Sequence, residues 1–110
     1  SAPRELALRR MAAAGIPEPG VLVTAEDVTA GKPDSTGYRL AARRVGVEHG
    51  QCLVFEDATV GILAAEAAGA DLMIVTATHG QPIETAHGTL VDYDLVRVQV
   101  DAAGLRLHAV

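Results

Sequence analysis

Two short segments, residues 52–55 and 72–75, are apolar at every position, and they constrain the fold of this 110-residue chain most strongly. A strand with one face in water alternates apolar and polar side chains, so uninterrupted apolar runs predict strands buried on both faces. Between them, from about residue 58 to 68, apolar residues recur at helical spacing. A strand, a helix and a second strand in this order predict an α/β fold, with a parallel sheet covered by helices on both faces.

The earlier part of the chain extends this alternation of strands and helices. We expect a helix that ends near Gly15, with Ser1 as its N-cap and a proline in its first turn. The Val-Leu-Val run at residues 21–23 predicts a short buried strand, and a second helix is expected over residues 34–45. After residue 80 the pattern weakens, and residues 96–100 and 105–108 predict either a small hairpin or edge strands. The length leaves room for one domain, residues 1–110.

Composition narrows the classes of function. The net charge of −5 and an aromatic content of 3% argue against nucleic-acid binding, which needs a basic surface and stacking platforms. A bound cation can reverse the local field, so these values are compatible with a small phosphorylated substrate. No apolar stretch approaches the ~18 residues of a membrane span. The single cysteine, Cys52, cannot form an internal disulfide, and we expect a buried thiol in a reducing, cytoplasmic setting.

Glu56 and Asp57 come directly after the first apolar run and directly before a predicted helix. Adjacent acids at the end of a buried strand are costly unless positive charge meets them, and a helix N-terminus and a divalent cation both supply it. The alternative is that Asp57 is an ordinary N-cap and Glu56 is solvated. The local sequence alone leaves both interpretations open.

The loop before the second helix carries Lys32 between a glycine and a proline, a setting in which lysine can bind phosphate as a point charge. The alternative is a solvated lysine in a surface turn. A P-loop is excluded, because Pro33 follows Lys32 where that motif has Ser or Thr. The four histidines have no metal-ligand spacing. Only His79 falls near the predicted carboxyl edge of the sheet, where it is a candidate for substrate contact.

Four stretches, residues 21–28, 31–38, 54–62 and 64–70, together resemble the haloacid dehalogenase (HAD) superfamily. Their order and spacing are most similar to the sugar-phosphatase and β-phosphoglucomutase branch. The resemblance implies a Rossmann-like parallel sheet flanked by helices. It also implies a Mg²⁺-dependent phosphatase acting on a small sugar or polyol phosphomonoester through an aspartyl-phosphate.

Roles for individual residues follow from this resemblance by position. Lys32 would contact the transferring phosphoryl group and the nucleophile, so it is both a catalytic and a phosphate-binding candidate. Asp57 would coordinate Mg²⁺, with Glu56 as a direct or water-mediated ligand. Ser1 falls beside the family's phosphate-binding Thr/Ser position. Ser35 and Ala58 differ from the residues that the family often has, at positions where the resemblance implies that other residues are tolerated.

One family segment has no counterpart in these 110 residues. The nucleophile belongs to an Asp-x-Asp-Gly-Thr segment, which this sequence lacks. The resemblance therefore implies the C-terminal part of a HAD core without its N-terminal central strands and cap, completed by the missing half or by a strand-exchanged copy. Alternatives are a phosphosugar mutase on the same core, a phosphoaspartate receiver-like module, and a non-catalytic fragment.

Overall fold

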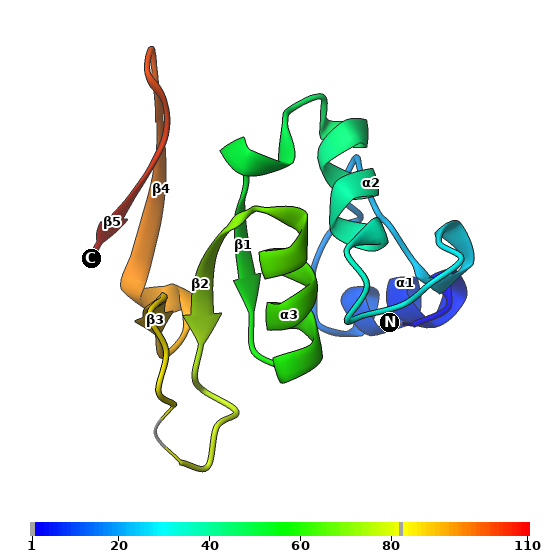
Figure 1. Ribbon diagram of the computed structural model, residues 1–110, viewed down its shortest axis with the longest axis horizontal. Coiled ribbons are helices and arrows are strands. Elements are labelled where there is room, and N and C mark those ends of the chain that lie inside the picture. Colours follow the sequence, from blue (N-terminus) through cyan, green and yellow to red (C-terminus); the bar gives the residue numbers. More distant parts are fainter. Residues whose placement is uncertain (1, 82) are drawn as a thin grey trace.

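The computed structural model describes residues 2–81 and 83–110 (Figure 1). Ser1, a predicted helix cap and phosphate contact, lies outside the described residues. The described chain contains a parallel sheet of β1 (Leu53–Glu56), β2 (Asp71–Val75) and β3 (Gly88–Leu90), in that order. The two apolar runs thus form adjacent parallel strands, as the sequence predicts.

Helix α3 (Thr59–Ala68) connects β1 to β2 and lies over one face of these strands (Figure 1). Along β2, Leu72 and Ile74 point to this face and are buried. The buried residues of α3 are all small: Gly61, Ala64, Ala65 and Ala68. Small side chains let the helix backbone approach the sheet closely, and this contact forms the core of the described chain.

The opposite face of the sheet differs from the prediction that helices cover both faces. Met73 and Val75 on this face are only half-buried, and Leu53 is 40% exposed. The ring of Tyr93, from the short 3₁₀ helix η3 (Tyr93–Leu95), gives partial cover by packing edge-on against Phe55, 5.4 Å between centroids. Helix α2 (Thr36–Val45) packs beside α3 instead of on this second face.

The three helices lie close to where the sequence predicts them. Helix α1 spans Arg4–Ala13, and α2 begins after Asp34, whose carboxylate accepts a hydrogen bond of 2.8 Å from the backbone N–H of Thr36. Helices α2 and α3 end at Gly46 and Gly69, with φ of 90° and 78°. A left-handed residue at this position closes the last turn, and glycine adopts it without steric cost.

The predicted strand at residues 21–23 is wrong for the described chain. These residues are half-buried but form no ladder, and η1 (Ala25–Asp27) follows them. A strand requires a hydrogen-bonded neighbour, and β1 pairs only with β2 within the described residues.

The C-terminal hairpin is confirmed, with β4 (Val96–Asp101) antiparallel to β5 (Gly104–Ala109). Figure 1 shows it standing apart from the three-stranded sheet. By contrast, β3 was not predicted, because its three residues lack an apolar run. Across residues 2–81 and 83–110, no helix combines the length and the apolar character that crossing a membrane requires.

Replacing Ile74 by alanine is expected to lower the free energy of unfolding by about 2–5 kcal/mol, because a fully buried side chain leaves a cavity in a close-packed core. Urea denaturation followed by circular dichroism measures this change. Val75→Ala, one residue further on the half-buried face, is the control and should cost clearly less. Equal losses for the two variants would contradict the placement of the core under α3.

Candidate active site

Glu56 and Asp57 lie at the carboxyl end of β1, and their environments differ sharply. Glu56 is 9% exposed, whereas Asp57 is exposed. The N-cap of α3 is Ala58, with no side-chain capping bond. The interpretation of Asp57 as an N-cap beside a solvated Glu56 is therefore wrong, and the buried carboxylate must be neutralised by other groups.

The Glu56 carboxylate accepts hydrogen bonds at both oxygens. Oε2 accepts from the ammonium of Lys32 at 2.9 Å and from the hydroxyl of Tyr38. Oε1 accepts from the backbone N–H groups of Asp57 at 3.1 Å and Ala58 at 3.4 Å, at the start of α3. One cation, one hydroxyl and the positive end of a helix together compensate the buried charge.

These contacts determine the protonation states of Glu56 and Tyr38. Burial raises the pKa of Glu56, but the hydrogen bonds from Tyr38 and Lys32 outweigh it and bring the pKa to about 2. Burial and the hydrogen bond to Glu56 raise the pKa of Tyr38 above its usual value. At neutral pH the carboxylate is therefore ionised, and the phenol keeps the proton that it donates.

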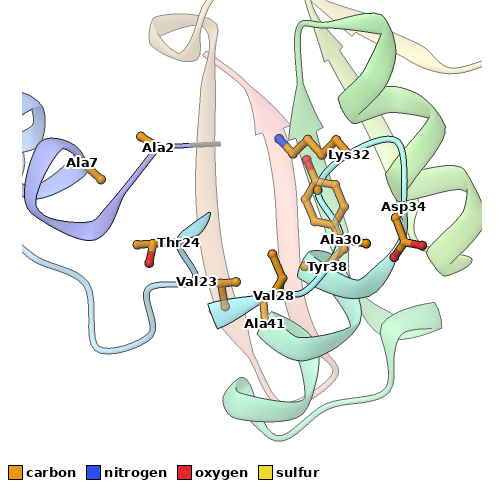
Figure 2. Close-up of a pocket in the computed structure, with 12 residues that line it drawn as sticks. Ala2, Ala7, Val23, Thr24, Val28, Ala30, Lys32, Asp34, Tyr38 and Ala41 are labelled. Atoms are coloured by element: carbon orange, nitrogen blue, oxygen red, sulfur yellow. The ribbon is translucent and has the colours of Figure 1, made fainter. Parts of the chain in front are cut away.

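Lys32 lies on the rim of a cavity of about 290 Å³ between α1, α2 and residues 23–31. Figure 2 shows its side chain beside Tyr38 at one end of this cavity, with Thr24 on the other side. The ammonium is 5.2 Å from the centre of the Tyr38 ring, within cation–π range. Lys32 is thus a paired cation that lines a cavity and remains 36% exposed, so it differs from a free surface lysine in having a carboxylate partner.

Asp57 is held by the loop after β2. Its Oδ2 accepts a hydrogen bond from the hydroxyl of Thr78 at 3.2 Å, and its backbone carbonyl lies 2.7 Å from Nε2 of His79. The expected position of His79 near the carboxyl edge is confirmed. The structure places its ring against the backbone of Asp57, and its predicted contact with substrate stays a prediction.

The sequence did not reveal the hydroxyl of Tyr38 as part of this site. Tyr38 falls within the helix predicted over residues 34–45, and in the structure it is half-buried. The available signal was its position in the first turn of the helix that directly follows the Lys32 loop. A phenol there can reach a polar partner with its tip while its body packs against the core.

The donor chemistry around Asp57 fits a magnesium ion. The carboxylate is exposed and hydrogen-bonded to one hydroxyl, and Mg²⁺ in proteins is held by one or two carboxylates, several waters and substrate phosphate. The oxygens of Glu56 already accept four hydrogen bonds, so they suit a ligand role less well. No group of three or more His, Cys, Asp or Glu able to hold a metal occurs within residues 2–81 and 83–110.

The sequence of this chain is similar to a family of hydrolases and to individual phosphatases. Residues 1–69 match the family model of haloacid dehalogenase-like hydrolases. The chain is 52% identical over 59 residues to validoxylamine A 7'-phosphate phosphatase of Streptomyces hygroscopicus subsp. limoneus, which covers 54% of this chain and 28% of that protein. It is 44% identical over 69 residues to hexitol phosphatase A of Escherichia coli K12, covering 63% and 32%.

A solved structure shows the same likeness. The crystal structure of a putative β-phosphoglucomutase from Thermotoga maritima superposes with a TM-score of 0.66 and 29% identity, covering 82% of this chain and 44% of that one. The chain therefore spans about a third of the length of these curated relatives and less than half of the solved structure. The matched family model covers most of the chain. The parallel strands β1 and β2 of this chain, connected by α3, agree with the fold of the solved structure. The chain belongs to the haloacid dehalogenase-like hydrolases.

Proposed function

We propose that the protein carrying this chain is a Mg²⁺-dependent phosphatase that hydrolyses a small sugar or polyol phosphomonoester. The observation that carries the proposal is the ion pair between Lys32 and Glu56, formed at the carboxyl edge of the sheet beside the exposed Asp57. Open α/β sheets bind ligands at this edge. The names of two relatives, a validoxylamine phosphate phosphatase and a hexitol phosphatase, support the class of substrate.

The residues of this chain act in the proposal by electrostatics and position. The Lys32 ammonium stabilises the negative charge that spreads over the phosphoryl oxygens, and it does so without transferring a proton. Asp57 would hold Mg²⁺ directly, and Glu56 would do so through water because its own oxygens already accept hydrogen bonds. The bound Mg²⁺ supplies charge neutralisation at the phosphoryl oxygens.

The nucleophile in this proposal comes from an Asp-x-Asp-Gly-Thr segment outside the 110 residues. Its first aspartate attacks phosphorus to give an aspartyl-phosphate, and the alkoxide leaves as the alcohol by taking a proton from the second aspartate of the segment. That second carboxylate then takes a proton from water, which attacks the acyl phosphate, releases inorganic phosphate and restores the first aspartate. Covalent catalysis needs an attacking group in line with phosphorus, which Lys32 and Asp57 do not provide. The proposal places the protein in the cytoplasm, in keeping with a free Cys52.

A phosphosugar mutase is the second candidate, favoured by the likeness to a putative β-phosphoglucomutase. The two reactions differ in the acceptor of the phosphoryl group, which is water in a phosphatase and a sugar hydroxyl in a mutase. Release of inorganic phosphate from a sugar phosphate, compared with formation of an isomeric sugar phosphate, distinguishes them.

The test compares the chain alone with a complemented protein, in which the chain is fused behind the part of hexitol phosphatase A that precedes the matched 69 residues. We expect the complemented protein to hydrolyse p-nitrophenyl phosphate and sugar phosphates with Mg²⁺ and to lose this turnover in EDTA. The chain alone should show no turnover, because the attacking aspartate is absent. Magnesium-dependent turnover by the chain alone would contradict the proposed source of the nucleophile.

A further inference from the structure

The hydroxyl and the ring of Tyr38 each contact one member of the ion pair at the proposed site. The hydroxyl donates to Oε2 of Glu56, the same oxygen that accepts the Lys32 ammonium at 2.9 Å. The ring lies beneath that ammonium, 5.2 Å from centroid to Nζ. Tyr38 is therefore in contact with both charges at once.

An ion pair alone does not fix the position of a lysine. The lysine side chain has four flexible methylene groups and a point charge without directional preference, so it can satisfy one carboxylate in many conformations. Here the Lys32 side chain is still 36% exposed, so packing alone does not restrain it. A fixed carboxylate and a ring below the ammonium together restrict these conformations.

Gly61 bounds the Glu56 carboxylate from the side of α3. A Cβ atom at this position would lie 2.0 Å from the carboxyl carbon of Glu56, far inside van der Waals contact. Gly61 lies within a helix and does not have a positive φ, so its backbone would accept alanine. The three heavy atoms nearest to such a Cβ all belong to the Glu56 carboxylate, so a side chain at this position would displace that group.

We propose that Tyr38 is a positioning residue, which fixes the Glu56 carboxylate against Gly61 and thereby holds the Lys32 ammonium at the cavity rim. That the Lys32 ammonium binds a phosphoryl group rests on the proposed function. The positioning of the ammonium by Tyr38 rests on the contacts described above. Tyr38 does not touch the reacting atoms in this proposal. It acts through Glu56 and Lys32, and its removal should reduce turnover without weakening substrate binding to the same degree.

The direct test measures hydrogen exchange at the side-chain ammonium of Lys32, which is the only lysine in the chain. Selective ¹⁵N-lysine labelling of the chain gives one side-chain ammonium signal, whose hydrogen exchange with water can be measured by NMR. Tyr38→Phe keeps the ring and removes the hydroxyl, and we expect exchange to accelerate about tenfold. Tyr93→Phe, in the other tyrosine, is the matched control and should leave the exchange rate unchanged.

Kinetics of the complemented protein give an independent readout. Tyr38→Phe should lower kcat about tenfold while KM changes less than about twofold, because a misplaced charge affects the transition state more than the bound substrate. Gly61→Ala displaces the same carboxylate from the other side. If both residues act through Glu56, the losses in the double variant should be clearly less than the product of the single losses.

These outcomes separate the inference from the proposed function. An unchanged exchange rate in Tyr38→Phe, an equal acceleration in Tyr93→Phe, or fully multiplicative losses with Gly61→Ala would overturn the role of Tyr38. Absence of phosphatase activity in the unsubstituted complemented protein would instead overturn the proposed function. The NMR comparison would in that case still decide whether Tyr38 positions Lys32.

Discussion

Replacing Asp57 by asparagine is expected to lower the Mg²⁺-dependent kcat/KM of the complemented protein by about 100-fold or more, since metal stabilisation of the transition state contributes several kcal/mol. The amide keeps the size of the side chain and its bond to Thr78 but removes the negative charge. A neutral oxygen binds Mg²⁺ more weakly, so the Mg²⁺ concentration for half-maximal rate should also rise. Initial rates across a magnesium titration measure both effects.

The control for this variant is Asp71→Asn, at the opposite end of the sheet. Asp71 is an exposed acid at the start of β2, so the substitution makes the same chemical change away from the carboxyl edge. Its rate and magnesium dependence should match those of the unsubstituted protein. An Asp57→Asn variant with unchanged magnesium dependence would show that Asp57 is not a metal ligand.

Replacing Lys32 by alanine is expected to lower kcat by about 100- to 1000-fold, the range seen when a preorganised charge-stabilising donor is removed. The substitution also leaves Glu56 buried without its cation, so part of the effect should appear as lost stability. Thermal unfolding recorded beside the rates separates the two contributions. Rates are compared at a temperature where both proteins are fully folded.

Arg9→Ala is the matched control for the lysine. Arg9 also pairs with a carboxylate, that of Glu5 at 2.8 Å, but both side chains are largely exposed on α1. Exposed pairs of this kind contribute little to stability, so neither rate nor unfolding temperature should change appreciably. Full activity in Lys32→Ala would exclude Lys32 from the stabilisation of the phosphoryl group.

Secondary structure was predictable where a segment carries its own pattern. Helices α2 and α3 show apolar spacing followed by glycine, and β1 and β2 are continuous apolar runs. The exceptions are segments whose structure depends on a neighbouring strand from elsewhere in the chain. The run at residues 21–23 has strand character but no neighbour in the described chain, whereas β3 is a strand only because β2 lies beside it.

The residues of the site could be predicted from the sequence, but the contacts between them could not. Adjacent acids after a buried strand and a lysine in a Gly-Lys-Pro loop indicated a charged site. The direct bond between Lys32 and Glu56 spans 24 positions, and no local pattern encodes it. Nor could the sequence show which acid is buried, because Glu56 ends β1 while Asp57 lies in the turn before α3, and only the fold determines which of these positions is covered.

The short connection of β1 to β2 through α3 has a consequence for how the site assembles. Residues 53–75 contain most of the buried core, and their contacts join segments close in sequence, which favours early formation during folding. Glu56 and Asp57 lie inside this unit, while Lys32 and Tyr38 come from a separate loop and helix. We therefore expect the acidic half of the site to form within this local unit, and its counter-charge to join it when α2 packs against α3.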